Sequence, residues 1–513
     1  METPACMLSA RTQEEAPRAE IVTLIVIAMC LFAFHTLIND RYGFHRDELA
    51  TIDDAHYLAW GYVAYPPLTP FLGRVALELF GTSLRGLRFF PALAQAVVAL
   101  LTGLMARELG GKRFAQAVAA LAVAIAPMSL FGGSVLQYVS FDYLWWVLLA
   151  YLLIRLLRTQ DPRLWLALGA TIGVGMLTKY TMAFLVAGVI VGVVLTDARR
   201  YLTSQWLWFG VALSLLIFLP NLIWQIQHDF VSLDFLQHIH ARDVALGRHK
   251  PFLLQQFYLA VNLVTLWLWW SGLRFYFFAP EGKPYRLLGW AFLVPLVLFI
   301  VTQGRGYYLA PAYPMLLAAG AAAEERWISS LAVRWSRLLR LGTFALLGVG
   351  AVLVLPQMTP IAPVDSWLWH KVTKLNPDFQ DEVGWPELVA EVARVRDTIP
   401  PDEQARTGVL AIDYAQAGAI DLYGPKYGLP RVISGINSFW FRGYGSPPPE
   451  TLVVVGLERE HAKQFFQNCE TAGHIPNVYG VANEASRKYS EILVCRNLRE
   501  PWPEFWEKFR YYG

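Results

Sequence analysis

Long apolar segments recur along most of this chain, and they restrict it to folds that a lipid bilayer can hold. A transmembrane helix needs about 20 mostly apolar residues, and fewer where neighbouring helices bury its ends. The sequence predicts eleven such spans. They cover roughly 20–39, 86–106, 114–133, 140–157, 163–178, 180–196, 205–225, 253–278, 287–303, 307–323 and 338–357. The predicted fold class is therefore a polytopic α-helical membrane protein.

The composition agrees with this fold class. Charged residues make up 16% of the chain and hydrophobic residues 55%, whereas soluble globular chains carry about 25% charged residues. Aromatic residues cluster near the ends of apolar runs, as at Trp145, Trp146 and Trp267, where interfacial belts form. The net charge of +3 is small and does not indicate a nucleic-acid partner. We expect contacts with membrane lipids and none with nucleic acid.

The basic residues of the loops predict the orientation. Cytoplasmic loops are enriched in Lys and Arg, so residues 1–19 are predicted to form a cytoplasmic segment. Every second loop after it is then basic, while the short outer connections hold little Lys or Arg apart from Lys179 and Arg305. An odd number of spans places residues 359–513 on the outer face. The basic residues of the inner loops are Arg107, Lys112, Arg113, Arg155, Arg158, Arg163, Arg199, Arg200, Lys283, Arg286, Arg326, Arg334, Arg337 and Arg340.

The first outer loop, 40–85, begins with the run FHRDE, which places Asp47 and Glu48 directly after the first span. Polar groups this close to a bilayer are costly and usually functional. Alternatively, Asp47 is an N-cap and Glu48 only interacts with the dipole of the helix that follows.

An amphipathic helix is predicted over 47–62, lying in the interface. Its apolar residues Leu49, Ile52, Tyr57 and Trp60 are expected to face lipid. Asp53, Asp54 and His56 are expected to form its wet face, with a metal site shared with Asp47 as the alternative. Pro66-Pro67 breaks this helix as a structural turn and starts a second interfacial helix over 68–80.

Beyond residue 358 the charge rises and long apolar runs disappear. Short β-rich stretches alternate with helical patterns, which predicts a small soluble α/β domain over 359–513. Cys469 and Cys495 lie in this region, and outside the cytoplasm they can form a disulfide, although two cysteines do not determine a pairing. Strands are expected at 408–412, 431–434, 452–455 and 491–495, and helices at 413–423 and 459–469.

Four polar sites share the outer face in this topology. They are Asp47-Glu48, Asp142 at the start of the fourth span, Lys179, and Arg305 with Tyr307 and Tyr308. Each has a structural interpretation: Asp142 as a helix cap, the two cations as anchors near lipid headgroups, and the tyrosines as belt aromatics. His45 and Arg46 also suit headgroup phosphate. A shared face is necessary for a shared site and does not establish one.

Taken together, these residues suit chemistry on a phosphorylated lipid. Lys and Arg bind phosphate, and a carboxylate can take a proton from an acceptor hydroxyl. A phosphate leaves without an acid catalyst, so a single base suffices. Glycoside hydrolysis differs, because two carboxyl groups flank the bond.

Four motifs in this order resemble the family 39 glycosyltransferases of the GT-C fold. These enzymes are bacterial relatives of protein O-mannosyltransferases and of the aminoarabinose transferase that modifies lipid A. The resemblance covers roughly 20–325, and the C-terminal domain more weakly. The motifs are FHRDEL at 44–49, YPPLTP at 65–70, LTKY at 177–180 and YYLAP at 307–311.

The resemblance implies a polyprenyl-phosphate sugar donor, an acceptor on the periplasmic side of a bacterial inner membrane, and inversion at the anomeric carbon. The acceptor is a glycan, a lipid or a protein, and the departure of 359–513 from the mannosyltransferase pattern weakens the case for protein. Residues 20–358 would form the catalytic domain. Some relatives hold a divalent metal near the phosphate; no ligands can be matched here, and no cofactor is assigned. The implied catalytic residues are Asp47, Glu48 and Asp142, and the implied donor-phosphate residues are Lys179, Arg305, Arg46, Tyr307 and Tyr308.

Two other functions fit part of the pattern. A carrier or flippase for a lipid-linked glycan would use the same charged groups along a path, but a path requires polar residues deep in several spans. The predicted spans hold mainly Ala, Leu, Val and Gly, which favours the enzyme. A receptor or scaffold would explain the C-terminal domain and leave the acid pair without a role.

Overall fold

The computed structural model describes residues 4–480 and 483–513, so residues 1–3 of the predicted cytoplasmic segment lie outside the described part. The chain forms two compact units, and each is assembled from separated segments. The first unit contains 1–38, 88–223 and 243–359, and the second contains 39–87, 224–242 and 360–513. The division that the sequence predicts, with a catalytic domain ending near residue 358, stays a prediction.

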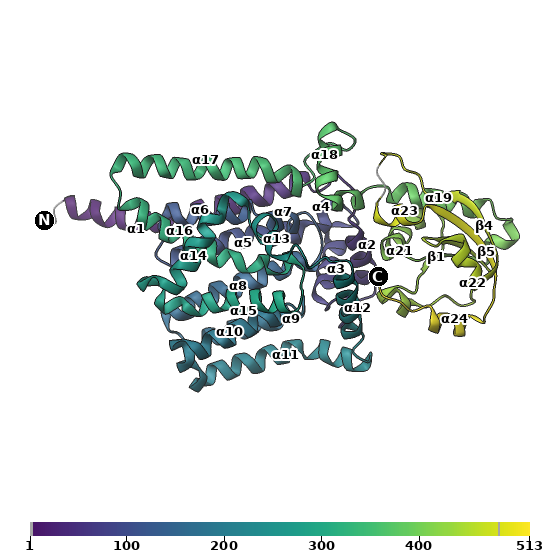
Figure 1. Cartoon of the computed structure of the whole chain (residues 1–513), viewed down its shortest axis with the longest axis horizontal. Helices are drawn as coiled ribbons and strands as arrows, with labels where there is room; N and C mark the ends of the chain where they lie inside the picture. Colours follow the sequence, from purple (N-terminus) through teal and green to yellow (C-terminus); the bar gives the residue numbers. More distant parts are fainter. Residues whose placement is uncertain (1–3, 481–482) are drawn as a thin grey trace. The chain divides into compact units, whose positions relative to one another are not determined.

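The first unit is built from helices, and the long ones run side by side (Figure 1). Six helices of the described residues are long and apolar enough to cross a membrane, or up to eight if each of two bent pairs is one span. The α-helices are α1 (Pro4–Ile38), α5 (Phe89–Glu108), α6 (Arg113–Ala124), α7 (Pro127–Gly132), α8 (Tyr138–Thr159), α9 (Leu164–Met176), α10 (Met182–Leu195), α11 (Gln205–Gln227), α13 (Phe252–Gln255), α14 (Leu266–Phe278), α15 (Arg286–Val301), α16 (Tyr313–Ser329) and α17 (Val333–Met358). Short helices η1 (Asp197–Thr203), η2 (Gln256–Ala260), η3 (Leu263–Thr265), η4 (Pro280–Tyr285) and η5 (Gly306–Ala312) connect them.

Each predicted span coincides with a helix or a broken helix, but several are shorter than expected. The segment predicted at 114–133 is interrupted between α6 and α7, and α9 has only 13 residues. The segment at 253–278 is bent by 89°. A polytopic membrane architecture is therefore supported, and the count of eleven stays a prediction.

Small residues let the helices at the centre of this unit pack closely. Gly272 of α14 and Gly320 of α16 lie where these helices cross. A Cβ added at Gly272 would lie 2.1 Å from the Leu316 carbonyl oxygen, and one added at Gly320 would lie 2.0 Å from the Leu268 carbonyl oxygen. Helix interfaces in membranes are commonly built from such residues. The apolar surfaces of α11 and α17 remain mostly exposed, as expected for lipid-facing helices.

The second unit contains a five-stranded sheet in the order β2-β1-β3-β5-β4. Strands β1, β4 and β5 are labelled in Figure 1. Strands β2, β1 and β3 are parallel, and β5 and β4 are antiparallel additions. The strands are β1 (Thr407–Ala411), β2 (Val432–Ile433), β3 (Thr451–Val455), β4 (Phe466–His474) and β5 (Glu491–Leu498). Strands β1 and β3 are buried along their whole length, as is usual for parallel strands covered on both faces.

Helices of the segments 39–87 and 224–242 and of the C-terminal region complete this unit. They are α2 (Arg46–His56), α3 (Leu68–Phe80), α4 (Leu84–Leu87), most of α12 (Val231–Ala245), α18 (Trp367–Leu375), η6 (Pro377–Glu382), α19 (Trp385–Asp397), α20 (Pro401–Gln404), α21 (Tyr414–Tyr423), η7 (Gly424–Tyr427), η8 (Asn437–Arg442), α22 (Arg459–Phe465), α23 (Glu484–Lys488) and α24 (Trp502–Lys508). A disulfide joins Cys469 of β4 to Cys495 of β5, which are directly paired residues.

The second helix of the first outer loop has the predicted bounds, with Pro67 as its N-cap residue. The first helix differs from the prediction, because it ends at His56 and is not amphipathic toward lipid. Leu49 and Ile52 are 0% and 2% exposed. Leu49 packs against Gly418 of α21, so Leu49 and Ile52 belong to a protein core and their predicted lipid contact is wrong. Tyr57 and Trp60 are exposed, and their lipid contact stays a prediction.

Candidate active site

A half-buried cation lies in the connection between α9 and α10 of the first unit. The Lys179 ammonium nitrogen lies 4.9 Å from the ring centroid of Tyr138, 5.2 Å from that of Tyr307 and 4.2 Å from that of Tyr308. Aromatic faces attract a cation electrostatically. Burial lowers the pKa of Lys179 to about 8; Asp142 opposes this shift and Arg305 adds to it.

Asp142 of α8 is the acidic neighbour of this cation. Its side chain accepts hydrogen bonds from the Trp146 indole at 3.0 Å and from the Thr181 hydroxyl at 3.1 Å, and the residue is 2% exposed. These two donors hold the carboxylate in one orientation, where it interacts electrostatically with Lys179.

Arg305 lies immediately before η5 and is held by Asp243. Its Nε donates to Asp243 Oδ2 at 2.5 Å, and Arg248 reaches the other oxygen of the same carboxylate at 3.2 Å. Two arginines therefore share one acid, and the group keeps a net positive charge. This arrangement suits an anion better than a closed one-to-one ion pair does.

Five predicted site residues thus come together in the first unit: Asp142, Lys179, Arg305, Tyr307 and Tyr308. Sequence reasoning missed Tyr138 and Asp243. Tyr138 lies four residues before Asp142 and therefore on the same helix face. This spacing could have identified Tyr138 from the sequence. Asp243 lies between the predicted spans 205–225 and 253–278, and no motif includes it.

The acid pair lies at the start of α2 in the second unit. The Asp47 side chain is 27% exposed. Its Oδ1 accepts a hydrogen bond from the Tyr414 hydroxyl at 2.8 Å, Arg46 Nε lies 3.9 Å from the same oxygen, and His45 Nδ1 lies 3.8 Å from Oδ2. Asp47 is therefore reachable from solvent while one of its oxygens is held in place.

Glu48 has a different environment. It is 0% exposed, and its Oε2 accepts the His45 backbone N–H at 2.8 Å while His45 Nδ1 accepts the Asp47 N–H at 3.2 Å. This reciprocal pair is a capping box with histidine as the N-cap. The structure thus gives Glu48 a role in beginning α2.

Arg46 is held by acidic residues of the C-terminal region. It pairs with Asp381 of η6 at 3.4 Å and with Glu484 of α23. A phosphate at this guanidinium would have to displace or share these two carboxylates.

Asp53 and Asp54 are not the wet face of α2, because they are 3% and 5% exposed. Arg442 of η8 reaches both carboxylates, at 2.9 Å and 2.6 Å. Asp54 also accepts a hydrogen bond from the Tyr65 hydroxyl at 2.7 Å. A buried charge needs such partners, and the distant Arg442 could not be foreseen from spacing.

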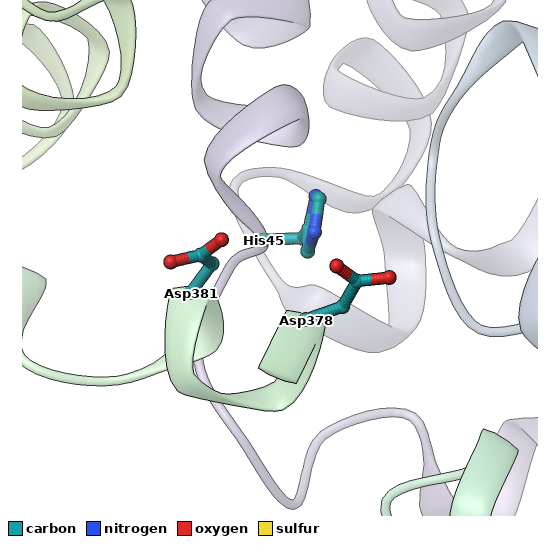
Figure 2. A group of neighbouring side chains, drawn as sticks. All are labelled: His45, Asp378 and Asp381. Atoms are coloured by element: carbon teal, nitrogen blue, oxygen red, sulfur yellow. The ribbon is translucent and has the colours of Figure 1, made fainter. Parts of the chain in front are cut away.

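His45, Asp378 and Asp381 lie close enough to hold a metal ion, with ligand atoms within 4.8 Å of one another (Figure 2). Their hydrogen bonds argue against this role. His45 Nδ1 accepts the Asp47 N–H, so in the neutral ring Nε2 carries the proton and is a donor. Metal-binding histidines normally donate through their second ring nitrogen. Asp381 already pairs with Arg46 and accepts the Glu484 N–H at 2.8 Å. We assign no step to a metal here.

This assignment predicts that metal ions do not stabilise the protein through these residues. Adding EDTA, or Zn²⁺ after EDTA, should leave the thermal unfolding midpoint of the detergent-purified chain unchanged, because ions that bind only the folded state raise that midpoint. A rise with Zn²⁺ that the Asp378→Asn substitution removes would overturn the assignment.

Comparisons with known proteins found a matching family model and related sequences. A family model described as dolichyl-phosphate-mannose-protein mannosyltransferase matches residues 64–224. A lipid A galacturonosyltransferase, RgtD of Rhizobium johnstonii, is 25% identical over 412 residues, covering 78% of this chain and 80% of the relative. An undecaprenyl phosphate-alpha-4-amino-4-deoxy-L-arabinose arabinosyl transferase of Pseudomonas aeruginosa is 28% identical over 377 residues, or 67% of each chain.

The fold is also that of a solved enzyme. The crystal structure of ArnT from Cupriavidus metallidurans in the apo state superimposes with a TM-score of 0.57 at 15% identity, and covers 93% of this chain and 98% of that one. At this identity the likeness shows the fold alone. Together with the family model and the related sequences, it supports a GT-C, family 39-like glycosyltransferase, as the motifs predict.

Proposed function

We propose that this enzyme moves a sugar from a polyprenyl-phosphate donor to a hydroxyl of a periplasmic glycan or lipid. The donor assignment rests on the surroundings of Lys179. Its ammonium lies among three tyrosine rings, and it interacts electrostatically with Arg305, which shares Asp243 with Arg248. A phosphate monoanion or dianion is bound by charged N–H donors such as this ammonium and these guanidinium groups. The printed name of the arabinosyl transferase relative includes undecaprenyl phosphate, and that of the galacturonosyltransferase includes lipid A, which supports this class of donor and acceptor.

In the proposed reaction Asp47 takes the proton of the acceptor hydroxyl. The acceptor oxygen then attacks the anomeric carbon of the sugar, and the bond from that carbon to the phosphate oxygen breaks. The electron pair of that bond leaves with polyprenyl phosphate, whose charge Lys179 and Arg305 balance. Asp142 orients Lys179, and attack opposite the leaving group inverts the anomeric carbon. General-base assistance of this kind typically contributes about 10²–10⁴ in rate.

Two predicted residues receive other roles in this proposal. Glu48 caps α2, so the base is Asp47. Arg46 pairs with Asp381 and Glu484, so the donor phosphate is assigned to Lys179, Arg305, Tyr307 and Tyr308. The alternation of basic loops supports a multi-pass inner-membrane protein whose second unit faces the periplasm.

The reaction is tested with purified enzyme in proteoliposomes. The donors are labelled polyprenyl phosphates carrying galacturonic acid or 4-amino-4-deoxy-L-arabinose, and the acceptor is lipid A. Label that moves to lipid A, or that is released slowly by water, supports the transferase. Donor that crosses the bilayer with its sugar bond intact, and without transfer, would establish the carrier function instead.

Lys179→Met is expected to weaken donor binding about 10–100-fold, because a hydrogen bond to a charged group is worth about 1.5–3 kcal/mol. Methionine keeps much of the length of the side chain and removes its charge. The measurement is the dissociation constant of polyprenyl phosphate by fluorescence or calorimetry. Lys283→Met, at an exposed lysine of η4, is the matched control and should bind normally. Equal affinity in Lys179→Met and the wild type would return Lys179 to a structural role.

A further inference from the structure

We infer that Tyr414, in the C-terminal α/β region, is a positioning residue for Asp47. Through its hydroxyl, the outer domain would act directly on the proposed base. This inference rests on the proposed function and extends it to a residue outside the four motifs. Tyr414 lies 367 positions from Asp47 in the sequence.

The local structure places Tyr414 at the end of a central strand. Strand β1 ends at Ala411, and Asp413 caps α21 by accepting the Ala415 N–H at 2.8 Å. Tyr414 is therefore the first residue of α21, at the carboxyl end of the parallel strands. In open α/β sheets this is the edge where ligands bind. Here the edge presents a tyrosine hydroxyl to Asp47.

The packing of α21 on α2 fixes the approach. A Cβ added at Gly418 would lie 2.6 Å from both the carbonyl carbon and the carbonyl oxygen of Leu49, so only glycine permits this distance between the two backbones. Tyr414 lies four residues before Gly418 and therefore on the same face of α21. Leu49 in turn lies two residues after Asp47. The close contact at Gly418 thus brings the Tyr414 hydroxyl within hydrogen-bond distance of Asp47.

The Tyr414 hydroxyl is a short-range hydrogen-bond donor to the Asp47 carboxylate. It lies 2.8 Å from Oδ1. His45 Nδ1 is 3.8 Å away and already accepts a hydrogen bond, and Arg46 Nε is 3.9 Å away, held in turn by Asp381 and Glu484. A donor to one carboxylate oxygen fixes the plane of the carboxylate. It also stabilises the ionised form, which is the form that accepts a proton.

Tyr414→Phe tests the inference in the full chain, because it removes only the hydroxyl. We expect kcat for sugar transfer to lipid A to fall about tenfold, as the loss of one hydrogen bond to a charged group predicts. The KM for the polyprenyl-phosphate donor should not change. The acidic limb of the kcat profile should move to higher pH by about one unit, because the carboxylate loses a donor that favours its ionised form. A purely structural role would not move that limb.

Three further variants sharpen the test. Gly418→Ala keeps the hydroxyl but forces α21 away from α2, and should reproduce the loss in kcat. Tyr414→Phe combined with Asp47→Asn should be no worse than Asp47→Asn alone, since residues acting through one interaction are not additive. Tyr427→Phe, at the end of η7 in the same region, is the control and should keep wild-type kcat.

The outcomes separate this inference from the proposed function. If Asp47→Asn abolishes turnover while Tyr414→Phe leaves both kcat and the acidic limb unchanged, the positioning role is refuted and the base assignment stands. If Asp47→Asn itself turns over normally, the proposed base is refuted. If Tyr414→Phe lowers kcat and moves the acidic limb, and adds nothing to Asp47→Asn, the inference is supported.

Discussion

Asp47→Asn should lower kcat for sugar transfer by about 10²–10⁴-fold, the usual contribution of a general base. The substitution is conservative, because the asparagine oxygen can still accept the Tyr414 hydroxyl that Asp47 Oδ1 accepts at 2.8 Å. The local geometry is kept and only the basic group is lost. Donor affinity should stay close to wild type, since the phosphate is assigned to other residues. Single-turnover kinetics and donor-binding measurements on the same preparation separate the two quantities.

Two comparisons make the Asp47 result specific. Asp40→Asn alters an acid of the same loop that is 40% exposed and pairs with Arg85 at 2.9 Å, and it should leave kcat unchanged. Glu48→Gln disturbs the capping box and should cost up to about 1–2 kcal/mol of stability. If Glu48→Gln removes activity as completely as Asp47→Asn without loss of folded protein, the base is Glu48 and our assignment is wrong.

Arg442→Met should destabilise the second unit by about 3–5 kcal/mol, the cost of leaving buried charges without their partner. Arg442 is the guanidinium between Asp53 and Asp54, and its side chain is 8% exposed. Hydrogen exchange of peptides covering α2 and η8 measures the effect locally. Arg406→Met, which breaks an exposed pair with Glu450, is the control and should cost about 0–1 kcal/mol. Adding Asp53→Asn and Asp54→Asn to Arg442→Met should restore much of the protection.

The same cluster predicts how stability depends on pH. Burial raises the pKa of Asp54 to about 7, against the opposing effect of Arg442, and burial also raises the pKa of Asp53. Burial also raises the pKa of the nearby Asp421 to about 7. Between about pH 4 and pH 7 the folded state therefore binds more protons than the unfolded state, so stability falls as pH rises through this window. Asp54→Asn should reduce this loss of stability with rising pH, measured as hydrogen-exchange protection of α2. If the pH dependence of protection does not change, Asp54 is not the carboxyl responsible for it.

Parts of this fold could be read from local sequence signals. Helix α3 has its predicted bounds because Pro66-Pro67 marks its start and a glycine follows its end. Four of the five strands were expected, since runs such as TLVVV at 451–455 are buried and β-branched. Strand β4 was missed: it was expected to continue the helix that begins at Arg459. Its sequence, FQNCETAGH, has little apolar alternation, and pairing with β5 along one edge decides its conformation.

Single residues of the candidate site could be predicted from the sequence, but their partners could not. The motifs identified Asp47 and Lys179, and the scarcity of basic residues in the outer connections identified Arg305, but the partners of these residues come from distant positions. Tyr414, Asp243 and Arg442 carry no local pattern, because their roles depend on tertiary contacts. Leu49 and Asp53 were misjudged for the same reason: a helix beside a membrane was expected to divide its faces between lipid and water, and α2 is covered by α21 instead.

The interleaved composition of the second unit has a consequence for biosynthesis. In the proposed topology the first outer loop is translocated early, yet its partner on α21 lies 367 residues further along the chain. At about 5–20 residues per second, the ribosome needs roughly 20–70 s to supply it. During this interval the partners Tyr414 and Arg442 are not yet synthesised. The carboxylates of Asp47, Asp53 and Asp54 therefore remain solvated by water. A chain whose translation stops early would keep the loop that carries the proposed base but lack α21 and η8, so we expect activity to appear only after the C-terminal segment has been translocated.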